Sequence, residues 1–383
     1  DSEDTRVMIE SLRRLGFEVQ ADWASALVKI QGLGGIVPAT TADLYIANSG
    51  TSVRFLTALA ALGHGRFRLH GTPRMHQRPI QDLVDPLEQL GVRAECETAS
   101  GCPPLIVEAN GLPGGTAELR GNVSSQFLSG LLLVAPYAVQ GVELTLVGTL
   151  VSQPYVEMTL AVMRAFGIDL APTSLQHYAI APAHYRPVAE YCIEPDASAA
   201  SYFFAAAAIS GGEVTVDGLS RGSLQGDIGF CDCLKQMGCE ILYGQNSITA
   251  AGPRGAQKLR GIEVNMNAIS DTVQTLATVA MFAEGPTIIT GVAHIRFKET
   301  DRIGNLAIEL RALGAIVDEL PDGLRITPQN PHGARIATYD DHRMAMSLSL
   351  VGLRVPGVII ENPKCTEKTY PTFFDDLAKL SKI

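Results

Sequence analysis

The chain has 383 residues, which is enough for two or three domains that each bury a core. Hydrophobic residues make up 46% and charged residues 18% of it, a composition typical of a globular α/β protein and unlike that of a disordered or fibrous one. The net charge of −10, without a basic stripe, argues against nucleic-acid binding, and no apolar stretch is long enough to span a membrane.

One predicted element recurs five times along the chain: an amphipathic helix that ends in a large apolar residue and a glycine and then leads into a short strand. A glycine at this place supplies the left-handed conformation that a helix C-cap needs. A sixth helix of this kind is expected over FFDDLAKL, residues 373–380. The five glycines are 75, 76, 71 and 76 residues apart, at Gly16, Gly91, Gly167, Gly238 and Gly314.

A second predicted element alternates with the first: a polar loop that leads into a helix rich in Ala, Leu and Ser. Because these helices are apolar nearly all round, we expect them to be buried. Runs such as RFRLHGT, VELTLVGT, GEVTVDGL and PTIITGV predict strands between the helices. The five loops start 74, 74, 74 and 70 residues apart, at Asn48, Asn122, Asp196, Ser270 and Asp340.

Five copies in phase predict an internal repeat in which each unit contributes strands, one buried helix and one amphipathic helix to shared cores. The chain contains six amphipathic helices and five buried ones, and it opens directly on an amphipathic helix. We therefore expect the first half-repeat to be missing, with about 45 residues of strand, polar loop and buried helix before Asp1.

The starts of the buried helices are expected to bind anions, because free backbone N–H groups and the positive end of the helix dipole meet there. Six such starts facing one cleft would form an electropositive pocket in an acidic protein. For Arg74 alone, exposure to solvent is the simpler interpretation. Four other cations lie at turns or helix starts and are better suited to carboxylate or phosphate groups: Arg78, Arg302, Arg343 and Lys368.

Two carboxylates lie near these cations. Asp271 opens the fourth buried helix, where it would serve either as an N-cap or as a proton acceptor. Glu299 lies between Lys298 and Arg302, where it would either form an i,i+3 ion pair or transfer protons. Neighbouring cations keep carboxylates ionised, so proton transfer would require burial or substrate contact to shift one pKa.

The seven cysteines predict no metal site. They form no CxxC pair, and Cys231, Cys233 and Cys239 have no further ligand at a suitable spacing. We expect reduced thiols in a cytoplasmic protein. The first residues also lack a charged segment followed by an apolar one, so we expect no signal peptide.

Eight motifs resemble the 5-enolpyruvylshikimate-3-phosphate (EPSP) synthase family, and the likeness runs from DSEDTR to the end of the chain. In order, they are NSGTSVR, RMHQRPI, SSQFLSGLL, SQPYVE, SLQGDI, KETDRI, YDDHRMAM and PKCTEKTYP. The resemblance implies a two-domain inside-out α/β fold with three βαβαββ units per domain, whose helix N-termini face an interdomain cleft that holds the active site. The domains would be residues 1–193 and 194–383, with a hinge near Tyr191 to Glu194.

The resemblance also implies a reaction in the synthesis of aromatic amino acids. The 5-hydroxyl of shikimate 3-phosphate attacks C2 of phosphoenolpyruvate while C3 gains a proton, and phosphate then leaves. No metal or organic cofactor is required, the protein would be a monomer, and its partners would be these two small molecules.

The family motifs assign roles to residues of this chain. Asp271 would be the base on the hydroxyl, Glu299 the proton donor and acceptor at C3, and Lys298 a third catalytic group. Gln126 would reach both substrates. Shikimate 3-phosphate would be held by Ser124, Ser125, Gln126, Ser152, Tyr155, Asp271 and Lys298. Phosphoenolpyruvate would be held by Gly50, Arg78, Gln126, Arg302, Arg343 and Lys368.

Three features depart from the family pattern. The Lys-Ser…Arg motif of the first buried helix, which would contact both substrates, does not occur. Phe55 stands where many members have Pro, which could change the tolerance of glyphosate, an inhibitor that occupies the phosphoenolpyruvate site. His294 stands where many members have an Asn that contacts substrate.

Two other interpretations stay open. A sister enzyme transfers enolpyruvyl to UDP-N-acetylglucosamine, but it usually carries a reactive Cys in the loop that matches RMHQRP, and SSQ and SQPYV favour the shikimate substrate. The chain could instead be a large fragment that a separate N-terminal piece completes, or a binding scaffold of the same fold. As a fragment, residues 1–383 would give little or no turnover alone.

Overall fold

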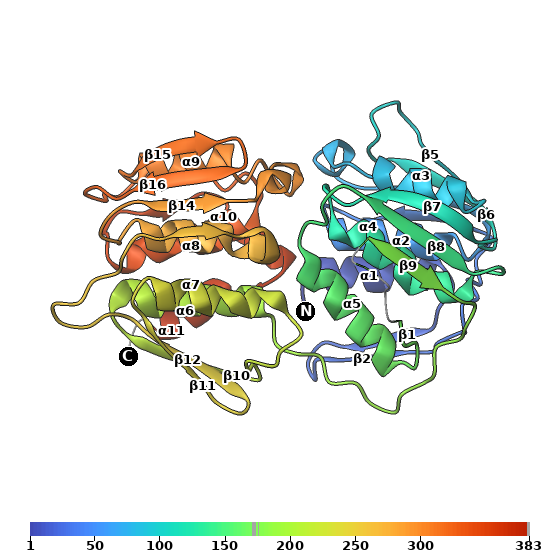
Figure 1. The fold of residues 1–383 in the computed structure, drawn as a ribbon, viewed down its shortest axis with the longest axis horizontal. Coiled ribbons are helices and arrows are strands. Elements are labelled where there is room, and N and C mark those ends of the chain that lie inside the picture. The colour runs from blue at the N-terminus through green and yellow to red at the C-terminus, as the bar shows by residue number, and fades with distance from the viewer. Residues whose placement is uncertain (171–173, 175, 381–383) are drawn as a thin grey trace. The chain divides into compact units, whose positions relative to one another are not determined.

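The computed structural model describes residues 1–170, 174 and 176–380 of the chain (Figure 1). These residues form two compact units, Asp1–Tyr191 and Cys192–Ile383, here called unit 1 and unit 2. The boundary expected from the sequence lies two residues further along the chain. Both units are of the α/β type.

Among the described residues of unit 1, the strands form one hairpin and two sheets. Within the four-stranded sheet, β3 (Thr41–Tyr45) and β4 (His64–His70) run parallel, and β6 (Leu105–Asn110) runs antiparallel to both β4 and β5 (Arg93–Cys96). The hairpin is β1 (Val19–Asp22) and β2 (Leu27–Ile30). The larger sheet has the order β3 (Thr41–Tyr45), β4 (His64–His70), β6 (Leu105–Asn110), β5 (Arg93–Cys96). The smaller one has the order β7 (Gly115–Arg120), β8 (Val142–Val147), β9 (His177–Ile180).

Two buried helices fill the centre of unit 1. They pack closely because Gly130 lies between them: a Cβ atom there would come within 3.3 Å of the carbonyl oxygen of Arg54. The buried helices are α2 (Gly50–Ala60) and α4 (Ser125–Val134). The outer helices are α1 (Glu3–Arg14), α3 (Gln81–Gln89) and α5 (Gln153–Ala165), with short 3₁₀ helices η1 (Met75–Gln77) and η2 (Ala135–Tyr137).

The four-stranded sheet of unit 2 repeats the strand order and strand directions of the larger sheet of unit 1. Its order is β13 (Glu263–Asn265), β14 (Thr287–Thr290), β16 (Gly323–Thr327), β15 (Ile316–Leu320). The other sheets are β10 (Glu213–Asp217), β12 (Ser247–Ala251), β11 (Glu240–Tyr243), and the parallel pair β17 (Arg335–Ile336), β18 (Ile359–Ile360).

Three buried helices form the centre of unit 2, between the β13–β16 and β10–β12 sheets (Figure 1). Their hydroxyl groups meet: Oγ1 of Thr275 lies 3.3 Å from Oγ of Ser201 and 3.2 Å from Oγ of Ser347. The buried helices are α6 (Ala197–Ser210), α8 (Val273–Ala280) and α10 (His342–Ser349). The outer ones are α7 (Phe230–Gln236), α9 (Gly304–Ala312) and α11 (Phe373–Leu380).

The helix ends agree with the sequence in most respects. All five C-cap glycines have positive φ, between +86° and +103°, as predicted. The prediction of a strand directly after Gly167 is wrong for residues 168–170, which form none, and residues 171–173 and 175 lie outside the described residues. In the described part of the chain, no helix is long and apolar enough to cross a membrane, and no group of His, Cys, Asp and Glu side chains is arranged to hold a metal ion.

Candidate active site

Charged side chains from four separate segments of unit 2 meet in one cluster. Each segment lies in or directly after a 3₁₀ helix or near a helix start, where the chain can turn and direct a side chain inward. The cluster comprises Asp271 in η4 (Asn267–Thr272), Lys298 and Glu299 directly after η5 (Ala293–Phe297), Arg302 before α9, Asp341 and Arg343 at the start of α10, and Lys368 at the end of η7 (Pro363–Lys368).

Arg302 is the centre of this cluster and is only 1% exposed. Its Nε donates to Asp341 at 2.7 Å, its Nη1 to Asp271 at 3.2 Å, and its Nη2 lies 2.7 Å from Oε2 of Glu299. Burial alone would lower the pKa of Arg302, but the three carboxylates outweigh it and raise the pKa. The guanidinium therefore holds three carboxylates in fixed positions.

Asp271 faces three cations. Its carboxylate lies 3.1 Å from Nη2 of Arg343 and 3.7 Å from Nζ of Lys298, in addition to Arg302. Burial would raise the pKa of Asp271, but these cations outweigh burial and hold the pKa below its ordinary value of 3.8. The alternative role as an N-cap is wrong: α8 begins at Val273 with Thr272 as its N-cap residue, and no side-chain capping bond forms there.

Glu299 lies between two cations and is 7% exposed. Besides Arg302, Nζ of Lys368 lies 3.5 Å from its Oε1. The i,i+3 ion pair predicted from the sequence is thus confirmed. Both carboxylate oxygens are held, so the group keeps one orientation.

Burial lowers the pKa of two histidines of unit 2. Burial, together with the charge of Lys298, lowers the pKa of His294 to about 4. Burial and the neighbouring Lys368 and Arg343 hold the pKa of His342 well below its ordinary value. The cluster therefore keeps its excess of cations, four against three carboxylates, without a contribution from either imidazole.

In unit 1, Gly50 and Arg78 lie against each other at the start of α2. Arg78 is 2% exposed, and its Nη1 donates to the carbonyl oxygen of Asn48 at 2.8 Å. A Cβ atom on Gly50 would overlap Nη2 of Arg78. A glycine is therefore required here for the guanidinium to lie beside the helix start.

The starts of α2 and α4 are joined through one amide. Nη1 of Arg54 donates to Oε1 of Gln126 at 2.5 Å, and Nε2 of Gln126 donates to Oγ1 of Thr51 at 3.1 Å. The Arg54 guanidinium also lies over the ring of Phe127, 5.2 Å from its centre. The Gln126 side chain is thereby oriented from both ends.

The second turns of α4 and α5 are also linked. Oγ of Ser129 and Oγ1 of Thr159 are 2.7 Å apart. Ser152, the N-cap residue of α5, is buried with a positive φ of 53° and precedes Tyr155 by one turn. Unit 1 thus places hydroxyl and amide groups at the starts of α2, α4 and α5, and unit 2 gathers cations around three carboxylates.

Such groups suit ligands with phosphate and carboxylate groups. The sequence model of one family, EPSP synthase (3-phosphoshikimate 1-carboxyvinyltransferase), matches residues 1–377. The chain belongs to the EPSP synthase family.

Individual relatives agree with this assignment. The chain is 44% identical over 379 residues to a protein of Trichormus variabilis named 3-phosphoshikimate 1-carboxyvinyltransferase, covering 99% of this chain and 88% of that protein. It is 45% identical to the protein of the same name from Shewanella denitrificans, covering 100% and 89%. The solved structure of EPSP synthase from Acinetobacter baumannii superposes with a TM-score of 0.78 at 27% identity, covering 100% and 88%.

The structure of this EPSP synthase family member adds residues that were not predicted as site residues. Asp341 is fully buried and binds Arg302 through both oxygens. The DDHR sequence at a predicted helix start is the feature that could have indicated it as a site residue. Arg54 and Thr51 orient Gln126. Tyr202, which accepts from Nη1 of Arg343 at 3.3 Å, lies in an apolar helix and gave no signal in the sequence.

Proposed function

We propose that this chain transfers the enolpyruvyl group of phosphoenolpyruvate to the 5-hydroxyl of shikimate 3-phosphate and releases phosphate. One observation carries the proposal: in a member of the EPSP synthase family, buried Arg302 holds the two carboxylates that the reaction needs, Asp271 and Glu299, in one cluster with three further cations.

Shikimate 3-phosphate would bind through the hydroxyl and amide groups of unit 1. The Ser124 end of α4 offers backbone N–H groups and a positive dipole end to the phosphate. Gln126 is oriented by Arg54 and Thr51, so it is ready to bind without a cost for ordering its side chain. The full set would be Ser124, Ser125, Gln126, Ser152 and Tyr155, with Asp271 and Lys298.

Phosphoenolpyruvate carries a phosphate and a carboxylate, and both suit cations. Arg302, Arg343 and Lys368 are already held together through Asp271 and Glu299. Arg78, beside Gly50, would complete the set from unit 1, with Gln126 reaching both substrates. The arginines can bind the two anionic groups in bidentate fashion.

The proton transfers would use the two carboxylates. Asp271 takes the proton of the 5-hydroxyl as its oxygen attacks C2, and Glu299, after it has taken up a proton from solvent, gives that proton to C3. When the C2–O bond to phosphate breaks, Glu299 takes one proton back from C3, and the proton held by Asp271 leaves with the phosphate. Lys298 balances the charge beside Asp271. The lowered pKa of Asp271 in the free protein makes it a weak base. The substrate must therefore first draw some of the neighbouring cations away from Asp271, so that its pKa rises.

The proposal includes the sixfold repeat of βαβαββ units, three in each domain. The shared strand order of the two four-stranded sheets supports it, as do the five glycine-capped helices. The domains would be residues 1–193 and 194–383, with helix starts around the active site.

The test measures phosphate released from phosphoenolpyruvate, with shikimate 3-phosphate or UDP-N-acetylglucosamine as acceptor. Release that depends on shikimate 3-phosphate supports the proposal. Release that occurs only with the nucleotide sugar, or no release with either acceptor, would overturn it.

A further inference from the structure

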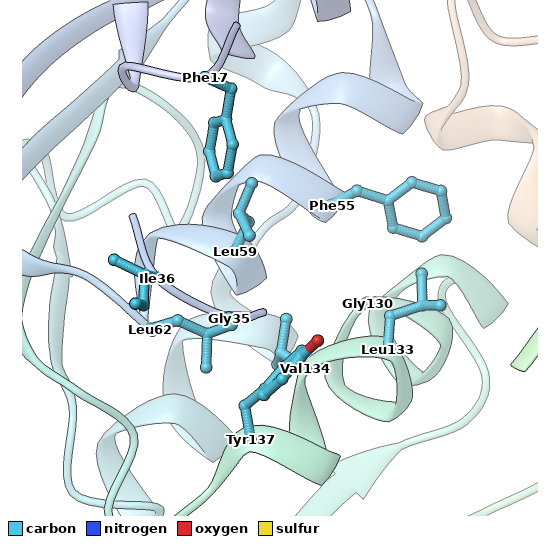
Figure 2. Close-up of a pocket in the computed structure, with 10 residues that line it drawn as sticks. All are labelled: Phe17, Gly35, Ile36, Phe55, Leu59, Leu62, Gly130, Leu133, Val134 and Tyr137. Carbon is cyan, nitrogen blue, oxygen red and sulfur yellow. The ribbon is translucent and has the colours of Figure 1, made fainter. Parts of the chain in front are cut away.

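An apolar pocket in unit 1 and a buried carboxylate in unit 2 both lie outside the proposed reaction. The pocket, which Figure 2 shows beside α2 and α4, has no charged side chain among its ten lining residues, so it offers no charge to an anionic substrate. The carboxylate belongs to Glu309, a residue in the second turn of α9 that is only 4% exposed. Burial of a carboxylate is costly unless hydrogen-bond donors replace its water. The donors around Glu309 therefore indicate what this side chain holds.

Both oxygens of the Glu309 carboxylate bind the segment that precedes α10. The hydroxyl of Tyr339 donates to Oε1 at 2.7 Å, and the backbone N–H of Ala337 donates to Oε2 at 3.1 Å. Burial, together with the Glu309 carboxylate, raises the pKa of Tyr339 to about 12, so the hydroxyl keeps its proton and remains a donor at neutral pH. Hydrogen bonds to a carboxylate are stronger than those between neutral groups. Glu309 thus ties α9 to residues 337–339.

The segment that Glu309 holds contains an unfavourable turn. Tyr339 and Asp340 have φ angles of +54° and +55°. Residues other than glycine rarely adopt this left-handed conformation, and one as bulky as tyrosine keeps it only where surrounding contacts impose it. In the second residue of the turn, Oδ1 of Asp340 accepts from Nδ2 of Asn362, the N-cap residue of η7. The turn is therefore held from two elements, α9 and η7.

The turn leads directly into the charged cluster. Asp341, the next residue, is fully buried and accepts from Arg302 through both oxygens. Its Oδ1 also accepts from the backbone N–H of Arg343 at 2.9 Å, at the start of α10. Arg302 lies two residues before α9 and Glu309 lies within α9, so one element and its start hold both ends of residues 337–341. A change in the turn would therefore also move Arg343.

We propose that Glu309 is a positioning residue for phosphoenolpyruvate: it fixes the turn at residues 339–340 and thereby directs the Arg343 guanidinium toward the substrate. The proposal rests on the proposed function, in which Arg343 binds phosphoenolpyruvate. Without this hold, the Arg343 side chain, whose Nη2 lies 3.1 Å from Asp271, gains other orientations. The affinity for phosphoenolpyruvate then falls, while the hydroxyl and amide groups of unit 1 that would bind shikimate 3-phosphate stay in place.

Tyr339→Phe tests the proposal, because it removes the hydroxyl that binds Glu309 and keeps the ring. The dissociation constant of phosphoenolpyruvate, measured by calorimetry without turnover, should rise about tenfold, the effect of losing one hydrogen bond to a charged group. The dissociation constant of shikimate 3-phosphate should not change. Tyr243→Phe is the matched control: its hydroxyl donates to Asp232 at 3.4 Å in the same unit, and its loss should change neither constant.

A second variant tests whether the effect passes through Glu309. The side chain in Glu309→Gln has nearly the same shape, but its single carbonyl oxygen can replace only one of the two carboxylate oxygens. This variant should also weaken binding of phosphoenolpyruvate. Combined with Tyr339→Phe, it should weaken binding by less than the product of the two single effects. Full additivity would show that the two side chains act independently and would overturn the proposal.

Hydrogen exchange reports on the turn itself. The backbone N–H of Asp341 donates to the carbonyl oxygen of Thr338 at 2.9 Å, and that of Arg343 donates to Asp341. In Tyr339→Phe, exchange at these two amides should become about tenfold faster, whereas exchange in β11 and β12 should stay the same. Unchanged exchange at both amides would overturn the positioning role.

Two binding results would also overturn it. One is an unchanged dissociation constant of phosphoenolpyruvate in Tyr339→Phe. The other is equal weakening of both ligands, which would indicate a general loss of structure. A wild type that binds no phosphoenolpyruvate would overturn both this role and the proposed function. A wild type that binds it and shows the expected variant effects, yet releases no phosphate, would overturn the proposed reaction and leave the role of Glu309 supported.

Discussion

Nη2 of Arg302 lies 2.7 Å from Oε2 of Glu299, and both side chains are almost completely buried. Removing one partner of a buried ion pair leaves the other charge without compensation. Here the guanidinium also binds Asp341 and Asp271, and Glu299 also faces Lys368. The cluster can therefore lose one charge and keep its geometry. The role of each carboxylate can thus be tested by substituting it alone.

Glu299→Gln should lower kcat by about 10²- to 10⁴-fold, because the amide cannot give or take the proton at C3. The KM values should change little, since the amide has the same shape and Arg302 keeps two other partners. Steady-state phosphate release measures both quantities. Glu263→Gln, at an exposed site on β13, should leave both unchanged. Equal losses in binding and turnover would refute the proton-transfer role.

Asp271→Asn should also act mainly on kcat, because it removes the proposed base. It leaves Lys298 and Arg343 without their shared carboxylate, so it should also lower the free energy of unfolding by about 1–3 kcal/mol at pH 7. Urea unfolding and steady-state kinetics measure the two effects. Asp318→Asn, at an exposed position of β15, is the matched control. An Asp271→Asn enzyme with wild-type kcat would exclude the carboxylate as the base.

Gly50→Ala should raise the KM for phosphoenolpyruvate at least about tenfold, equivalent to about 1.4 kcal/mol of binding free energy. The added methyl group would overlap the Arg78 guanidinium and force it away from the start of α2. The KM for shikimate 3-phosphate should change less. In Gly32→Ala the methyl group meets nothing within 4 Å, so this variant should behave as the wild type does. An unchanged KM for phosphoenolpyruvate in Gly50→Ala would argue against Arg78 as a ligand.

The sequence predicted the features that depend on local chemistry. Gly16 and Gly314 cap their helices with positive φ, because a left-handed residue is needed wherever a helix turns back into a strand. The burial of helices α6 and α8 follows from sequences that are apolar nearly all round. The pair of Glu299 and Arg302 follows from their i,i+3 spacing.

Features that depend on tertiary contacts were not predictable in this way. Asp271 was interpreted as a possible N-cap, but tertiary ion pairs to Lys298 and Arg343 take its carboxylate, and Thr272 becomes the N-cap residue instead. Tyr202 lies in an alanine-rich helix, and its bond to Arg343 joins residues 141 positions apart. No local sequence pattern predicts a contact between two residues so far apart in the chain.

His294 should give the protein a pH-dependent stability that His294→Asn removes. Burial and Lys298 lower its pKa from 6.5 to about 4, so between these values the unfolded chain binds more protons than the folded one. The stability that neutral His294 maintains is therefore complete above pH 6.5 and decreases as the pH falls toward 4. Between pH 7 and pH 5, wild type should lose about 1–2 kcal/mol more of its free energy of unfolding than His294→Asn does. Urea unfolding at the two pH values measures this difference, with His332→Asn at an exposed site as the control.

His342 also has a lowered pKa and remains in the variant, so the variant should keep a pH dependence of the same sign that is smaller than that of the wild type. Identical pH dependence in wild type and His294→Asn would show that the folded protein does not hold this imidazole neutral.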